Sequence, residues 1–68
     1  MTRVITVNGT TYQFDEKMDI DALLAMLKLT DAICAVEVNS TLVSHHDREN
    51  FKLQDGDTVE IVSLVGGG

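Results

Sequence analysis

Residues 58–64, "TVEIVSL", decide the fold of this chain. If the segment is a β-strand, successive side chains point to opposite faces, so Val59 and Ile61 share one face and Val62 lies on the other. A strand that is apolar on both faces is typical of the interior of a sheet rather than its edge. We therefore expect the last strand to return to the middle of a sheet that earlier segments build.

The first two strands of that sheet are predicted near the start of the chain. Residues 3–8, "RVITVN", are rich in β-branched residues, which favour strands. Asn8-Gly9 follows, and because both residues tolerate a positive φ this pair is typical of a two-residue hairpin turn. In residues 11–15, "TYQFD", Tyr12 and Phe14 share one face, as in a returning strand.

A helix is predicted after the hairpin. Its apolar stripe, at spacings of three and four residues, consists of Ile20, Leu23, Leu24 and Leu27. Asp19 is the expected N-cap, since its carboxylate can accept the free amides of the first turn. Met18 is spaced to pack against Leu23 across that N-terminus. We expect the helix to end near Lys28 or Leu29.

The second half of the chain supplies the remaining strands. Residues 33–38, "ICAVEV", are predicted to form a third strand, and Leu42-Val43 a short fourth one. Residues 44–50, "SHHDREN", are predicted to form a polar, solvated loop that could include one helical turn, and Asp55-Gly56-Asp57 a tight turn. One amphipathic helix must then cover one face of one sheet. This order predicts an α+β class, with a β-grasp (ubiquitin-like) fold: a mixed four- to five-stranded sheet packed on one main helix, its other face open.

Length and composition limit the functions to consider. The chain has 68 residues, which is one small domain, and its net charge is −6, which disfavours nucleic-acid binding. The acidity fits either a basic protein partner or solubility alone. A single cysteine allows no internal disulfide, and no apolar run approaches the roughly 20 residues that span a membrane. We therefore expect a cytoplasmic protein without a membrane partner.

Few side chains are candidates for chemistry. Residues 45–49 form a dense polar cluster in which the adjacent His45 and His46 could bind a transition metal weakly, but a structural zinc site needs about four ligands, so we expect no metal here. Cys34 could be a nucleophile, yet it lies on a predicted core strand and no base is near it in sequence, so we expect a small buried residue. These side chains give no reason to predict an enzyme.

The glycine tail is the remaining candidate. We predict a folded domain over residues 1–65 and a flexible Gly-Gly-Gly tail over 66–68. The tail could be inert, a cloning remnant, or the bearer of a reactive carboxylate on Gly68. Three residues reach at most about 10 Å and, lacking Cβ atoms, can enter a narrow channel. Adenylation would turn that carboxylate into a good acyl donor, and a sulfur donor could then displace AMP.

Four stretches carry a resemblance to a known family along the whole chain. They are "ITVNG" at 5–9, "DALLAML" at 21–27, "AVEVNSTLV" at 35–43 and "LQDGDTVEIVSLVGGG" at 53–68. Together they resemble the ThiS family, the sulfur-carrier proteins of thiamine biosynthesis. One departure lies in residues 44–51, where many relatives have a proline and a tryptophan. Here neither occurs, and Arg48 stands roughly at the tryptophan position.

The resemblance implies a cycle and a set of partners. An E1-like adenylating enzyme (ThiF) would activate Gly68 with ATP, and a sulfur donor protein would convert it to a thiocarboxylate. Thiazole synthase (ThiG) would then take the sulfur. Gly67 would thread the partner active sites with Gly68, and Gly66 would lengthen that reach. The chain itself would bind no cofactor and would act as a cosubstrate rather than an enzyme.

A partner surface is expected beside the tail. If Val59 and Ile61 face the helix, Val62 and Leu64 face outward, where exposed apolar residues mark a binding surface. With Val65, Gly66 and Gly67 they make the predicted partner-binding set; the alternative is that a neighbouring loop covers Val62 and Leu64 or that they reflect strand propensity alone.

Three other functions stay open. A MoaD-like sulfur carrier for molybdopterin synthesis would share the fold and the tail. A ubiquitin-like protein modifier would end in links to amines rather than to sulfur. An interaction domain would keep its function after loss of Gly67 and Gly68.

Overall fold

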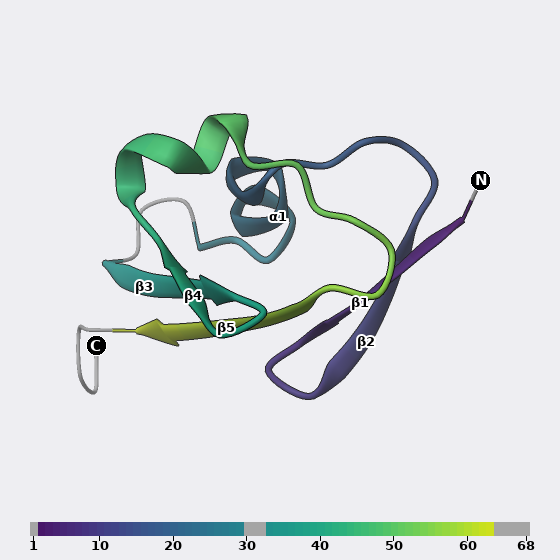
Figure 1. Cartoon of the computed structure of the whole chain (residues 1–68), viewed down its shortest axis with the longest axis horizontal. Coiled ribbons are helices and arrows are strands. Elements are labelled where there is room, and N and C mark those ends of the chain that lie inside the picture. The colour runs from purple at the N-terminus through teal and green to yellow at the C-terminus, as the bar shows by residue number, and fades with distance from the viewer. Residues whose placement is uncertain (1, 30–32, 64–68) are drawn as a thin grey trace.

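The computed structural model describes residues 2–29 and 33–63, which form a single mixed sheet with two helical segments on it (Figure 1). The elements are β1 (Arg3–Val7), β2 (Thr10–Phe14), α1 (Ile20–Met26), β3 (Cys34–Val38), β4 (Thr41–Val43), the 3₁₀ helix η1 (His45–Asn50) and β5 (Thr58–Ser63). The strand order is β2-β1-β5-β3-β4. The β-grasp prediction is confirmed. The last strand, β5, occupies the centre of the sheet, where its backbone pairs with β1 on one side and with β3 on the other.

The amino-terminal hairpin forms as predicted. Asn8 and Gly9 have φ angles of 48° and 84°, and Val7 pairs with Thr10 on either side of them. Two successive residues with positive φ match the right-handed twist of the flanking strands. Tyr12 and Phe14 pack on the core from the same face of β2, also as predicted.

Helix α1 begins as predicted and ends earlier. The Asp19 carboxylate accepts the Ala22 N–H at 2.7 Å, which confirms the N-cap. Leu27 is the C-cap, and Lys28 has a φ of 62°, so regular helix stops at Met26. The Leu29 N–H then donates to the Leu24 carbonyl at 2.8 Å and the Lys28 N–H to the Ala25 carbonyl at 3.0 Å. These two bonds make a Schellman motif in which lysine takes the position that glycine usually fills.

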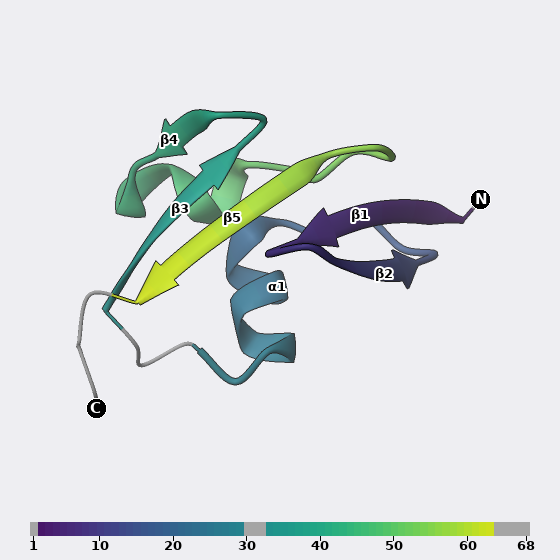
Figure 2. The same ribbon diagram turned by 90° about the horizontal axis from the view of Figure 1, so that it is seen from below.

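The core lies between α1 and one face of the sheet (Figure 2). Its largest fully buried side chains are Ile5, Ile20, Leu23, Val36, Leu53 and Val59. The predicted third strand is confirmed as β3, in which Val36 and Val38 are buried and Glu37 between them is exposed. No helix in the described ranges is long and apolar enough to cross a membrane.

The prediction of a solvated loop after β4 is wrong for one residue. Residues 45–50 form η1, and Arg48 is only 7% exposed while its neighbours in η1 are exposed. Its Nη2 donates to the Cys34 carbonyl at 2.8 Å, and η1 packs against α1. The guanidinium can be buried because a backbone carbonyl at the start of β3 accepts one of its hydrogen bonds.

Candidate functional site

Strand β5 carries the chain from the middle of the sheet toward the tail. It pairs in parallel with β1 and antiparallel with β3, and its carboxyl-terminal end lies at the opposite end of the molecule from the start of β1 (Figures 1 and 2). Val59 and Ile61 are buried toward α1 and Val62 is 57% exposed, so the predicted outward orientation of Val62 is confirmed. The other predicted site residues, Leu64, Val65, Gly66, Gly67 and Gly68, lie outside the described residues.

Asn8 extends the β1–β5 ladder beyond the end of β1. The backbone register ends at Val7 opposite Val59, after which the chain turns away at Asn8. The Asn8 side chain then donates through Nδ2 to the Ile61 carbonyl at 2.9 Å and accepts the Ile61 N–H through Oδ1 at 2.7 Å. One side-chain amide thus replaces the backbone partner that β5 would otherwise lack.

Asn39 likewise pairs with backbone groups of β5, at the start of that strand. It has a φ of 52°, its N–H donates to the Thr58 carbonyl at 2.8 Å, and its Oδ1 accepts the Thr58 N–H at 3.0 Å. Its Nδ2 also donates to the Asp57 carboxylate at 2.9 Å. Asn8 and Asn39 therefore fix β5 near both of its ends. Sequence reasoning missed this role of Asn39; the available signal was an asparagine directly after each neighbouring strand.

The two aspartates of the turn before β5 are occupied by backbone amides. Asp55 Oδ1 accepts the Val4 N–H at 2.7 Å, and Asp57 Oδ2 accepts the Gln54 N–H at 2.7 Å. Gly56 between them has a φ of 89°, which a side chain would strain. The tight turn predicted over Asp55-Gly56-Asp57 is confirmed.

The other reactive side chains do not assemble a site. Cys34 is a free, buried cysteine, as predicted. His45 and His46 are exposed, with their ring centroids 6.2 Å apart, and His45 Nδ1 lies 3.4 Å from Arg48 Nη1. Across the described ranges no group of three or more histidine, cysteine, aspartate or glutamate side chains could hold a metal ion.

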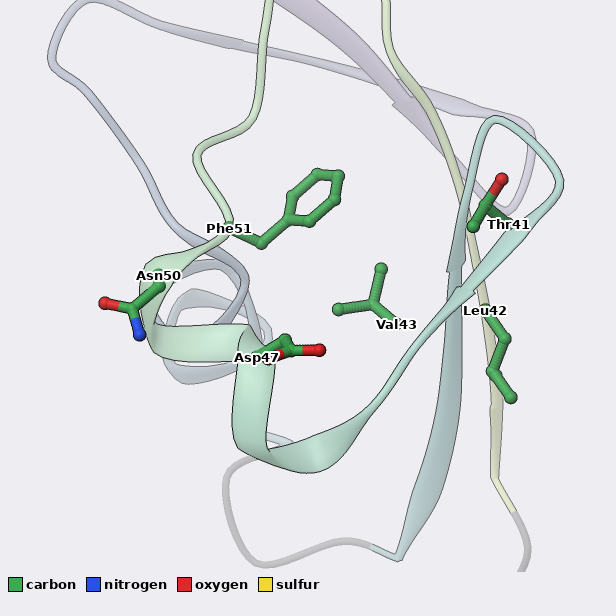
Figure 3. A pocket seen from close by; sticks show the side chains of 6 residues that line it. All are labelled: Thr41, Leu42, Val43, Asp47, Asn50 and Phe51. Atoms are coloured by element: carbon green, nitrogen blue, oxygen red, sulfur yellow. The ribbon is translucent and has the colours of Figure 1, made fainter.

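A shallow hollow of about 390 Å³ opens between β4 and η1 (Figure 3). It is lined by Thr41, Leu42, Val43, Asp47, Asn50 and Phe51. Val43 and Phe51 point into it, whereas Leu42 points away. Asp47 is its only ionisable side chain, and that carboxylate accepts the Ser44 hydroxyl at 2.9 Å. The hollow therefore brings together no pair of groups for acid–base or nucleophilic catalysis.

Comparison with known protein families assigns this chain to one of them. The model described as the ThiS family matches residues 5–68. The chain belongs to the ThiS family. The match includes β5 and the glycine tail, the two parts of the sequence on which the predicted function depends.

Solved structures agree with this ThiS assignment. A crystal structure of the thiamine biosynthesis protein ThiS from Geobacter metallireducens is 32% identical, with a TM-score of 0.79, over 96% of this chain and 99% of that one. A solution structure of a thiamine biosynthesis protein from the same organism is 31% identical, with a TM-score of 0.77, over 96% of this chain and 87% of that one.

Two sequence relatives extend the ThiS comparison. The protein ycf40 of Porphyra purpurea is 34% identical over 94% of this chain and 90% of its own length. The thiazole synthase of Paramagnetospirillum magneticum is also 34% identical over 94% of this chain, but the match spans only 20% of that protein. A ThiS-like segment is thus one part of a much longer thiazole synthase.

Proposed function

We propose that this chain is the sulfur carrier for thiazole formation in thiamine biosynthesis, with the carboxylate of Gly68 as its reactive group. The observation that carries the proposal is the ThiS family match, which runs through the tail to Gly68. The fold supports it because β5, the central strand of the sheet, leads toward those residues and is held by the Asn8 side chain at Ile61.

The proposed chemistry takes place at the tail in two steps. An E1-like adenylating enzyme of the ThiF type joins the carboxylate to the AMP moiety of ATP and releases pyrophosphate. A sulfide equivalent from a sulfur donor protein then attacks the acyl carbon and displaces AMP, which leaves a thiocarboxylate. The chain contributes reach and small cross-section: glycines carry no Cβ and can adopt the backbone angles that a narrow channel imposes.

The chain acts in this scheme as a protein cosubstrate and not as an enzyme. It binds no cofactor, and ATP is consumed by the adenylating partner. The described side chains are consistent with this division of work, since Cys34 is buried and Asp55 and Asp57 each accept a backbone amide N–H. The absence of a disulfide partner for the single cysteine fits work in the cytoplasm.

Thiazole synthase is the proposed acceptor of the sulfur. In the Paramagnetospirillum magneticum relative, a segment similar to this chain is part of a protein named thiazole synthase. Two activities joined in one chain are expected to work on each other's products. An acidic carrier, with a net charge of −6, would also be steered toward a basic docking surface on such an enzyme.

Intact-protein mass spectrometry tests the proposal directly. The chain is incubated with ATP, a ThiF-type enzyme and a sulfur donor, and peptide mapping locates any change. We expect one oxygen of Gly68 to be replaced by sulfur, and we expect no change in a variant that lacks Gly67 and Gly68. An unchanged mass with an adenylating enzyme that loads another ThiS protein would overturn the sulfur-carrier proposal, and links from Gly68 to lysines would favour a protein modifier.

A further inference from the structure

The sheet face away from α1 carries exposed apolar side chains beside two carboxylates. Val62 is 57% exposed and Leu42 is 65% exposed, and Glu37 and Glu60 are exposed as well. We call these four residues the outer patch. They lie on three adjacent strands, β4, β3 and β5.

Strand register places the outer patch in two neighbouring rows. Leu42 is opposite Glu37, and Glu37 is opposite Glu60, so one row crosses all three strands. Val62 is opposite Ala35 in the next row toward the end of β5. The residues between these rows, Val36 and Ile61, are buried against the core, so the outer patch faces the other way.

The two glutamates oppose each other without a cation. Directly opposed residues of antiparallel strands have Cβ atoms about 4.5–5.5 Å apart, and like charges there are destabilising. Strands β3, β4 and β5 contain no lysine or arginine. Within the part of the chain that the structure describes, the one ion pair joins Lys52 to Asp19, away from these strands. The free chain therefore retains a repulsion between the carboxylates of Glu37 and Glu60, which a neutral side chain at either position would remove.

Arginine is the group that best relieves such a pair. Its planar guanidinium can donate to two carboxylates at once, and its aliphatic stem can lie on apolar side chains such as Leu42 and Val62. A phosphate backbone or an anionic membrane would be repelled by the same carboxylates. The outer patch thus fits a protein that presents an arginine surrounded by apolar side chains.

We propose that the outer patch docks on the thiazole synthase and that this enzyme inserts an arginine between Glu37 and Glu60. The inference rests on the proposed function, which supplies the enzyme. Strand β5 contributes Glu60 and Val62 and runs on toward Gly68, so an enzyme that takes the tail lies beside the outer patch. The thiazole synthase that contains a segment similar to this chain favours that enzyme over the adenylating one.

Calorimetric titration of the full chain into the thiazole synthase of the same organism tests the inference. The variants are Glu37→Gln and Glu60→Gln. Each is expected to weaken binding about thirtyfold or more, as removal of one partner of a buried charge pair does, and to reduce the salt dependence of binding. Each is also expected to raise the melting temperature of the free chain by a few degrees, because the like-charge opposition disappears.

Glu49→Gln is the matched control. Glu49 is exposed on η1, on the helix side of the sheet, and the substitution changes the net charge by the same amount. Its affinity is expected to equal that of the parent chain. If Glu37→Gln and Glu60→Gln bind as tightly as Glu49→Gln, the inference is wrong.

Two further results separate the inference from the proposed function. Weaker binding of the variants to the adenylating enzyme alone would assign the outer patch to that enzyme and overturn the inference. A parent chain that forms the thiocarboxylate while all variants bind the synthase equally would refute only the inference. A parent chain that forms no thiocarboxylate but binds the synthase through both glutamates would refute only the proposed function.

Discussion

The Asn8 side chain pairs with both backbone groups of Ile61, at 2.9 Å from Nδ2 to the carbonyl and at 2.7 Å from the amide to Oδ1. The same residue opens the β1–β2 turn at a φ of 48°. One asparagine therefore reverses the first strand and holds the last one close to where it leads into the tail. Asparagine suits both tasks because it tolerates positive φ and carries a donor and an acceptor on one group.

Replacing Asn8 by glycine isolates the side-chain bonds. Glycine keeps the positive φ but leaves the part-buried Ile61 backbone groups without these partners, so we expect a loss of about 1–3 kcal/mol in the free energy of unfolding. Asn8→Ala should lose about 1 kcal/mol more, because alanine must also adopt the left-handed conformation. Urea denaturation of both variants measures the two contributions, and an Asn8→Gly chain as stable as its parent would contradict the assignment.

Two substitutions of Arg48, the buried residue of η1, separate the contributions of packing and of charge to the stability of the fold. Arg48→Ala removes a nearly buried side chain and its bond to the Cys34 carbonyl, so we expect a loss of about 2–3 kcal/mol in the free energy of unfolding. Arg48→Met keeps most of the volume and removes a charge that must be desolvated; a loss under about 1 kcal/mol is expected.

Thermal denaturation of the two Arg48 variants gives the comparison. Glu49→Ala is the control, since Glu49 is the exposed neighbour in the same helix and should change stability by about 0.5 kcal/mol or less. Equal losses for Arg48→Ala and Arg48→Met would show that the hydrogen bond, and not the filled volume, provides the stability.

The parts of the fold that the sequence predicts depend on local pattern. Val59, Ile61 and Val62 make β5 apolar on both faces, and that alone requires a central position. Asn8-Gly9 and the Asp19 N-cap are equally local, since their partners lie within a few residues. Each was predicted because no distant part of the chain is needed to explain it.

The features that the sequence does not reveal depend on distant partners. Arg48 is buried because the Cys34 carbonyl, fourteen residues earlier, accepts its hydrogen bond. Asn39 binds Thr58 and Asp57, which lie 19 and 18 residues later, and its place directly after a strand does not identify these partners. The patch on the outer face is also non-local: Glu37 and Glu60 meet only through the register of β3 and β5. A short polar segment such as 44–50 has the same composition whether or not one of its residues is buried.

Cys34 is expected to be dispensable for sulfur loading. The thiol is buried on β3 and carries no acid–base neighbour among the described contacts, so it should take no part in chemistry at Gly68. Cys34→Ala should lose about 1 kcal/mol of stability and form the thiocarboxylate in the same yield as the parent. Intact mass measures the yield, and thiol labelling with and without urea verifies the burial. A folded Cys34→Ala chain that is not loaded would contradict this prediction.

Lys28 is the position where a substitution should stabilise the fold. It sits at the C′ position of the Schellman motif that ends α1, with a φ of 62°, where a Cβ atom costs roughly 1 kcal/mol. Lys28→Gly removes that strain but increases the conformational entropy of the unfolded chain. We expect a net gain of about 0.5–1 kcal/mol in the free energy of unfolding.

Lys28→Ala is the control for the loss of the lysine side chain. Alanine keeps the Cβ atom and therefore the strained conformation, so its stability should stay close to that of the parent. For a chain of this size, a gain of about 1 kcal/mol raises the melting temperature by roughly 4–8 °C, which calorimetry resolves. If Lys28→Gly and Lys28→Ala melt together, the left-handed residue contributes no strain, and the early end of α1 must come from the packing of Leu29 against the core instead.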